Sequence, residues 1–587
     1  MASTEARPAG FVGLMAQTPG VEKVTTLVDE KDDAKIDVGS VAEEDIDLYV
    51  PLKLDGSVTH RDNPLTARAV LVGIILGCLV NASNLYLGLK TGFTFPASMF
   101  GAIFGYGIVN ILSKTFGNVP ILGGSFGPQE NSIIQAAATG AGGIAGIFVA
   151  GIPAMYQLKT IEMTPKDSYG SLITITLVGR ELKLLFPTPT AVALTIKSMH
   201  AGVAGAREAL SKLKALALAF FASLVQRVAS YYAVGILYDW HFFTWIHIWS
   251  GYTSWAMHIE SWGWWFEWTP AFIGSGILIG MNSALSMFGG AVIAWAIIGP
   301  ILVAIGECIG APQWDETTPE WHGYYSYAKL SNLGHETPSP RYWLLWPGVM
   351  MMVCTSMAEL VVQYKVIGHA CKTVWHKSCV TINDILVKRG KHSRYFSEKA
   401  ANEIKGVENM VPDPARPEDQ VQIWMWSSGL ILTIVGAILI FHYQWGMTAG
   451  LTILACVLGF MFSFLAIQIG AVTDQTPLTA ASKASQLVLG GVTSGQGLAI
   501  KDAQRINLVA GGLASGGADV AMTLTSDFRT GFLLGTPPIK QWYAQALGTL
   551  ISVFLAPGMF VLFTSAYPCI LDGEAEHCAF GVPSVAA

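Results

Sequence analysis

Long apolar runs recur along this chain from Ala67 to Tyr567, and several of them are long enough to cross a lipid bilayer. A helix needs about 20 apolar residues to cross a hydrocarbon core of about 30 Å, and its backbone must satisfy its hydrogen bonds within the segment. Hydrophobic residues make up 52% of the chain and charged residues only 13%. We therefore predict an all-α polytopic membrane protein that folds as a helical bundle in the lipid bilayer. No nucleic-acid partner is expected.

The distribution of charge along the chain predicts its orientation. Residues 1–63 are rich in Asp and Glu and have no apolar core, so they are expected to be a disordered tail and not a signal peptide. The loop that begins at Lys365 is the most basic, which predicts a cytoplasmic position for it and for the N-terminus. Residues 238–268 contain no Lys or Arg and many Trp, as is typical of a non-cytoplasmic interface. The regions expected are the tail (1–63), a first transmembrane region (64–370), a basic cytoplasmic loop (371–422) and a second transmembrane region (423–587).

Three apolar segments contain residues that interrupt a helix. NASNLYLGLKTGFTFPAS (81–98) holds asparagines, glycines, a lysine and a proline, and the segments 471–495 and 507–527 are rich in Gly, Ser and Thr. Such backbone is tolerated at membrane depth where protein covers it or where it lines a wet cavity. GLKTGFTFPAS also loosely matches GAVTDQTPLTAAS, which indicates an internal repeat, and paired interrupted segments point to the central site of a transporter. We predict broken or re-entrant helices that line a substrate path.

A further short element is expected in the segment 269–306. By the predicted orientation this segment must enter the membrane and return, and it is slightly short for two full spans and a turn at about 1.5 Å per residue. A short or re-entrant first half is therefore predicted, with Asn282 near its tip.

Several longer motifs occur together in the chain: NASNLYLGLKTGFTFPASMFGAIFGYGI, GPQENSIIQAAATGAGGIAGIFVAGIPAMYQL, LKLLFPTPTAVALTIKSMHAG and CAFGVPSVAA. With them the chain resembles the oligopeptide transporter superfamily, in a fungal form, from about Pro64 to its C-terminus. It lacks the Asn-Pro-Gly and Lys-Ile-Pro-Pro-Arg signatures of the peptide-transport clade, so it is more similar to the yellow-stripe-like clade. The resemblance implies a proton-coupled symporter of small oligopeptides or peptide-like compounds such as glutathione, in the plasma membrane or the vacuolar membrane, without a cofactor.

Two alternatives stay open. One is a transporter of metal chelates of the siderophore or nicotianamine kind. The other is a family member that does not transport, because the span before GRELKLLFPTPT is short and the chain ends at GVPSVAA, where the resemblance implies further spans. We expect both departures to be deletions or an incomplete gene model. An enzyme is not expected, since GGSFG (123–127) matches the serine-hydrolase pattern Gly-x-Ser-x-Gly without its strand-to-helix context.

The candidate site residues follow from the charges of such a substrate. A zwitterionic peptide or a carboxylate-rich chelate needs charge partners in a desolvated cavity. Lys90 and Lys483 are candidates for a carboxylate, Glu130 or Asp519 for an amino group, and a carboxylate in the cavity is expected to couple the proton. Each candidate also has a structural explanation without a role in transport. Glu130 and its neighbours can stabilise a helix terminus, Lys90 can lie at the membrane interface, and the asparagines can form hydrogen bonds between helices. The predicted substrate and proton pathway comprises Asn84, Lys90, Glu130, Asn131, Gln135, Asn282, Asp474, Lys483 and Asp519; no metal ligands are expected.

Cys569 and Cys578 flank an Asp-Gly turn signal in YPCILDGEAEHCAFG. The predicted orientation puts this loop outside the cell or in a lumen, where disulfides persist. We predict a disulfide between the two residues, the alternative being two unrelated thiols. The other cysteines are expected to be reduced.

Overall fold

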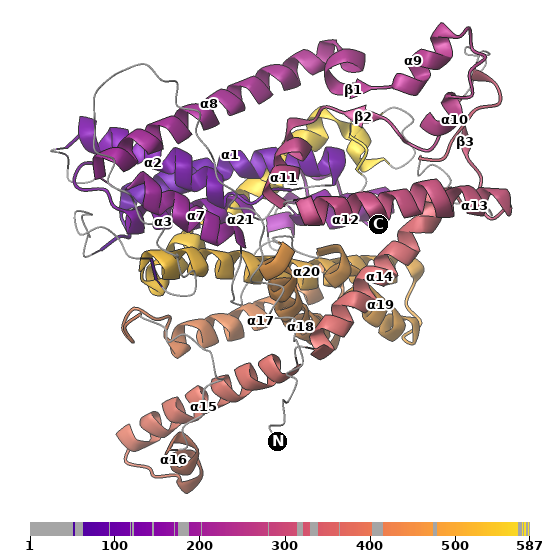
Figure 1. Cartoon of the computed structure of the whole chain (residues 1–587). Coiled ribbons are helices and arrows are strands. Elements are labelled where there is room, and N and C mark those ends of the chain that lie inside the picture. Colours follow the sequence, from indigo (N-terminus) through magenta and orange to yellow (C-terminus); the bar gives the residue numbers. More distant parts are fainter. Residues whose placement is uncertain are drawn as a thin grey trace, which may run out of the picture. The chain divides into compact units, whose positions relative to one another are not determined.

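Helices carry almost all of the regular structure in the described part of the chain (Figure 1). In this computed structural model, eight helices of the described residues are long and apolar enough to cross a membrane. The prediction of an all-α polytopic membrane protein is therefore confirmed.

The structure describes residues 51–52, 63–92, 94–117, 119, 122–143, 146–161, 163–169, 171–173, 187–200, 202–279, 281–313, 321–328, 338–362, 364–401, 415–473, 478–572, 578, 580–582 and 585. They all belong to one unit, Leu48–Ala587. The predicted N-terminal tail lies outside the described residues except for its end, and Asp474 lies outside them too.

The helices of the first half are α1 (Ala67–Thr91), α2 (Ser98–Thr115), α3 (Pro128–Gly142), α4 (Gly146–Val149), α5 (Gly151–Gln157), α7 (Pro187–Met199), α8 (Gly202–Tyr232), α9 (Phe242–Trp249), α10 (Met257–Glu260), α11 (Pro270–Ile279), α12 (Met281–Val292) and α13 (Gly299–Ala304). Single π-helical segments follow α8 (Val234–Tyr238) and α12 (Ile293–Ile298). The antiparallel pairs β1 (Asp239–Trp240) with β2 (Phe266–Glu267) and β3 (Ala311–Pro312) with β4 (Tyr325–Ser326) are two residues long.

The later helices are α14 (Pro340–Val362), α15 (Tyr364–Lys388), α16 (Arg394–Ala401), α17 (Ile423–Trp445), α18 (Ala449–Thr473), α19 (Leu478–Ser494), α20 (Ile500–Leu534) and α21 (Pro538–Ala566), followed by the 3-10 turn Pro568–Leu571. The boundary that we expected at residue 370 between membrane region and basic loop falls inside α15.

Helix α3 is the most enclosed element of the fold. All of its residues except Gln129 are buried, and it packs against α1, α2, α20 and α21. Its sequence is rich in Ala and Gly, and glycines on its neighbours let the backbones approach closely. A Cβ atom at Gly77 of α1 would lie 2.5 Å from the Ala138 carbonyl oxygen, and one at Gly548 of α21 only 2.3 Å from that of Ala137.

The segment 81–98 is interrupted as predicted. Helix α1 ends at Gly92, whose φ of 81° favours glycine, and α2 begins only at Ser98. The Asn84 side chain holds the loop between them, because its Nδ2 donates to the Phe95 carbonyl at 2.7 Å and its Oδ1 accepts from the Phe95 N–H at 2.9 Å. Asn84 is thus the residue that fixes the shape of this break.

The segment 507–527 is not interrupted, which corrects our prediction. It lies inside α20, a single continuous helix of 35 residues. Its glycines and serines suggest helix breaks in the sequence, but α18 and α19 pack along this helix and small residues permit that contact.

The segment 471–495 does contain a change of element, since α18 ends at Thr473 and α19 begins at Leu478. In the first half, α11 has ten residues and is too short to cross alone, in line with the predicted short element.

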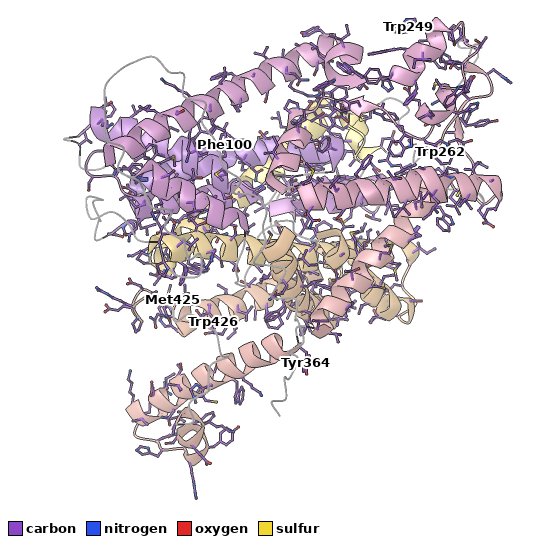
Figure 2. The ribbon with its side chains drawn as sticks, viewed as in Figure 1. Phe100, Trp249, Trp262, Tyr364, Met425 and Trp426 are labelled. Carbon is purple, nitrogen blue, oxygen red and sulfur yellow. A yellow bond between two sulfur atoms is a disulfide. The ribbon has the colours of Figure 1, made fainter. Side chains whose placement is uncertain are left out.

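The tryptophan-rich segment 238–268 folds as short helices and the β1–β2 pair, with Trp249 and Trp262 among its side chains (Figure 2). His241 lies between two carboxylates: its Nε2 is 3.0 Å from Asp239 Oδ2, and its Nδ1 contacts Glu260. Burial alone lowers the pKa of His241, but the hydrogen bonds to Asp239 and Glu260 outweigh it and raise the pKa above its ordinary value. These contacts link the start of the segment to α10.

Cys569 and Cys578 form a disulfide in the structure, with their Cα atoms 5.7 Å apart. The other described cysteines, Cys78, Cys308, Cys354, Cys379 and Cys456, are free thiols. The position of this loop outside the cell or in a lumen stays a prediction.

Candidate functional site

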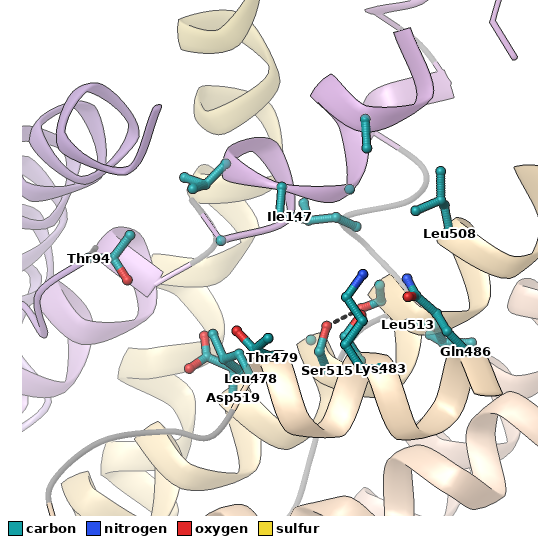
Figure 3. Close-up of a pocket in the computed structure, with 18 of the residues that line it drawn as sticks. Thr94, Ile147, Leu478, Thr479, Lys483, Gln486, Leu508, Leu513, Ser515 and Asp519 are labelled. Atoms are coloured by element: carbon teal, nitrogen blue, oxygen red, sulfur yellow. Dashed lines mark hydrogen bonds between the residues drawn. The ribbon is translucent and has the colours of Figure 1, made fainter. Parts of the chain in front are cut away.

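A cavity of about 230 Å³ lies where broken segments from the two halves of the chain meet (Figure 3). The first half contributes Gly92 and Thr94, which follow α1, and residues of α4 and α5. The second half contributes the start of α19 and the middle of α20. The three segments singled out in the sequence, 81–98, 471–495 and 507–527, therefore all provide walls of one cavity.

The cavity combines a mostly apolar wall with a few polar groups, as small-molecule sites do. Lys483 reaches into it from α19 and Asp519 from α20, and both side chains are half-buried (Figure 3). Within the described residues the Lys483 amine has no ion-pair or hydrogen-bond partner. The neutral polar groups at the cavity are Thr94, Thr479, Ser482, Gln486 and Ser515. The arrangement offers one cation, one carboxylate and several hydroxyl and amide groups to a ligand.

Lys90 and Asn282 are not among the residues that line the cavity. The Lys90 Nζ lies 5.1 Å from the centre of the Tyr238 ring, and the Arg227 guanidinium lies 4.9 Å from the same ring. Asn282 is exposed at the start of α12. For both residues a role in the substrate path stays a prediction, without support from their positions.

Glu130 forms a buried ion pair at the start of α3. Its carboxylate oxygens accept from Nε and Nη2 of Arg68, each at 2.7 Å, and one of them also accepts from the Thr66 hydroxyl at 2.5 Å. Arg68 is buried as well and donates to the carbonyl oxygens of Leu122, Gly123 and Ser125. The GGSFG segment is therefore a turn whose backbone binds Arg68. The geometry of Glu130 is that of a group that fixes α1, this turn and α3 together.

A row of buried polar side chains continues along α3. Gln135 donates to the carboxylate of Asp527 on α20, at 2.5 Å. Gln541 of α21 donates to the Ser132 hydroxyl at 2.9 Å and to the Asp527 backbone carbonyl at 2.7 Å. Farther along, Asn81 of α1 donates to Ser552 of α21 at 2.9 Å. The row also includes Asn131, Thr139 and Thr549.

Asp527 is a residue that the sequence analysis missed, although it ends the quoted segment 507–527. Its signal was a second carboxylate, after Asp519, in a stretch made mostly of apolar and small residues. Asp527 differs from Asp519 because it is completely buried beside the Gln135 amide of α3. That burial depends on contacts between residues that are far apart in the sequence.

The described residues contain no cluster of three or more His, Cys, Asp or Glu that could hold a metal ion. The HACKTVWHKSC segment lies in α15.

Apolar membrane-length helices around a central cavity, with broken segments from both halves in its wall, define a polytopic membrane transporter. The family comparison agrees: the model of the OPT oligopeptide transporter protein family matches residues 64–587. This chain belongs to that family, and the resemblance read from its motifs is confirmed.

Curated relatives carry two kinds of name. The chain is 22% identical to "Probable metal-nicotianamine transporter YSL9" of Oryza sativa subsp. japonica, over 94% of this chain and 77% of the relative. It is 22% identical to metal-nicotianamine transporter YSL2 of Arabidopsis thaliana, over 86% of this chain and 74% of the relative. It is 24% identical to "Putative oligopeptide transporter YGL114W" of Saccharomyces cerevisiae, over 52% of this chain and 41% of the relative.

Proposed function

We propose that this protein is a proton-coupled secondary transporter of small peptide-like zwitterions, with short peptides and glutathione-like compounds as substrates. The observation that carries the proposal is the cavity that holds Lys483 and Asp519 between the broken segments. We place the transporter in the plasma membrane or the vacuolar membrane, with its N-terminus in the cytoplasm.

The charges of the cavity support this substrate class. Taking an ion out of water is costly unless an opposite charge or several hydrogen bonds compensate it. The Lys483 amine, which has no partner among the described residues, suits a substrate carboxylate, and Asp519 suits an amino group. The glycines in the wall, among them Gly92, Gly512 and Gly516, let a ligand approach the backbone closely.

A metal chelate of the nicotianamine kind is the second candidate, and the names of the relatives favour it. Such a chelate also presents carboxylates, so it would use Lys483 in the same way. The two candidates are separated by uptake of labelled glutathione and of a labelled metal–nicotianamine chelate in cells that lack their own carriers for both. Saturable uptake of either compound supports transport and identifies the class, whereas uptake of neither contradicts the proposed substrates.

Lys483→Ala is expected to weaken transport of substrates with a free carboxylate about 10- to 100-fold in kcat/KM, because a charge-assisted hydrogen bond contributes about 1.5–3 kcal/mol. Carboxyl-amidated analogues should lose much less, and Lys483→Arg should retain most of the activity. Lys501→Ala is the matched control, since Lys501 is exposed at the start of α20 and does not line the cavity. Equal losses for free and amidated substrates would assign Lys483 to packing.

A further inference from the structure

We infer that Asp527 is the group that binds and releases the coupling proton. This inference rests on the proposed function and names a residue for its proton-coupled step. Asp527 lies on α20, and its side chain is completely buried. One carboxylate oxygen, Oδ1, accepts from Gln135 Nε2, and the other, Oδ2, has no hydrogen-bond partner.

The surroundings of Asp527 contain more acceptors than donors. Among the described residues, the amide oxygens of Gln135, of Gln541 and of Asn131, one turn before Gln135 on α3, are buried without a donor, and one donor, the Asn131 amide nitrogen, is buried without an acceptor. The Nε2 atoms of both glutamines are already used, for Asp527 Oδ1, for the Asp527 backbone and for Ser132. A proton on Oδ2 turns this oxygen into a donor in a site whose unsatisfied atoms are mainly acceptors.

No cation compensates Asp527 in the described part of the chain. Its side-chain partner there is the neutral amide of Gln135. Several charged or titratable side chains lie on α20 and on the helices packed against it, and none of them is paired with Asp527. They are Lys501, Asp502, Arg505, Asp519 and Arg529 on α20, Glu130 on α3, Tyr156 on α5, Lys197 on α7, His442 and Tyr443 on α17, Lys483 on α19, and Lys540 and Tyr543 on α21.

Glu130 and Asp527 are both buried carboxylates, but their contacts suit them to different tasks. Both oxygens of Glu130 accept hydrogen bonds from the Arg68 guanidinium. The ionised Asp527 would be a buried charge without a compensating cation, whereas the protonated Asp527 is neutral. Binding or release of one proton therefore switches this site between neutral and negatively charged. A group with these two states, and not one held by a guanidinium, can carry a proton through a transport cycle.

Two helices connect Asp527 to the cavity. Asp519, in the cavity wall, precedes Asp527 by eight residues on α20, and Gly143, also in the wall, follows Gln135 by eight residues beyond α3. Eight residues of α-helix span about 12 Å. The hydrogen bond between Gln135 and Asp527 thus joins two helices that also border the cavity, α20 at its middle and α3 just beyond its C-terminal end, and a change of charge there can bias both.

The test uses the full chain in proteoliposomes and compares Asp527→Asn, which keeps shape and loses titration, with wild type. With labelled glutathione or metal–nicotianamine chelate, wild type should accumulate label against its gradient when a pH gradient is imposed. Asp527→Asn should only equilibrate the label, while its counterflow exchange at equal pH stays within about twofold of wild type. Asp502→Asn, on the same helix but half-exposed and paired with Arg505, should accumulate label normally.

Accumulation by Asp527→Asn at the wild-type level would overturn the inference, and so would wild-type accumulation that follows a Na⁺ gradient and not the pH gradient. A second measurement covers a variant that loses both transport modes. Infrared difference spectra between low and high pH should show the carbonyl band of a buried carboxylic acid in wild type, and Asp527→Asn should lack it. An unchanged band in the variant overturns the inference. If wild type moves none of the substrates but Asp527→Asn removes the band, the proposed substrates fail and the proton site stands.

Discussion

Arg68→Ala is expected to lower the free energy of unfolding by about 3–5 kcal/mol, the loss typical when one partner of a buried ion pair is removed. The Arg68 guanidinium holds both Glu130 oxygens at 2.7 Å and three carbonyls of the turn at 122–125. Without it, the buried Glu130 carboxylate loses the guanidinium that binds both of its oxygens. Reversible unfolding in mixed detergent micelles measures this loss.

Two further variants serve as controls for Arg68→Ala. Arg68→Met combined with Glu130→Leu removes both charges, so it should lose less stability than Arg68→Ala alone, because no charge remains buried. Arg394→Ala, at an exposed arginine of α16, should change stability by no more than about 0.5 kcal/mol. If Arg68→Ala is no worse than Arg394→Ala, the ion pair does not hold α1, the turn and α3 together.

Gly548→Ala is the second substitution with a large expected effect, a loss of about 3 kcal/mol in the free energy of unfolding. The new Cβ would lie 2.3 Å from the Ala137 carbonyl oxygen, and backbone cannot move aside as a flexible side chain can. Helix α21 would have to move away from α3, the most enclosed helix of the fold, and would disturb the contact of Gln541 with Asp527.

The matched control for Gly548→Ala is Gly436→Ala on α17, where a Cβ meets no atom within 4 Å. Alanine favours the helix over glycine by about 0.5–1 kcal/mol, so this variant should be neutral or slightly more stable. The same unfolding measurement applies to both variants. Similar effects in the two would mean that the close approach of α21 to α3 does not contribute to stability.

The sequence predicted the features that depend on local composition. The break after α1 follows from Gly92 and the proline of the segment 81–98, and the membrane-length helices follow from their apolar runs. It misread 507–527, because glycine and serine break an isolated helix but also allow one helix to pack closely against two others. Composition alone does not separate these cases.

The site was predicted in part for a similar reason. Lys483 and Asp519 were proposed because they lie in polar segments between apolar runs, and both line the cavity. The pairing of Glu130 with Arg68 joins residues 62 positions apart, and neither residue carries a local sign of it. The importance of Asp527 depends on which partners surround it in space, which a linear pattern does not contain.

The most direct test of the account is accumulation of labelled substrate in proteoliposomes that contain the full chain and no other protein. With a pH gradient as the sole driving force, labelled glutathione or labelled metal–nicotianamine chelate should rise above its equilibrium level inside the vesicles, and a protonophore should abolish the rise. A chain that takes up neither compound under a pH gradient, or that only equilibrates them with and without the protonophore, would contradict the claim that this protein is a proton-coupled transporter of peptide-like compounds.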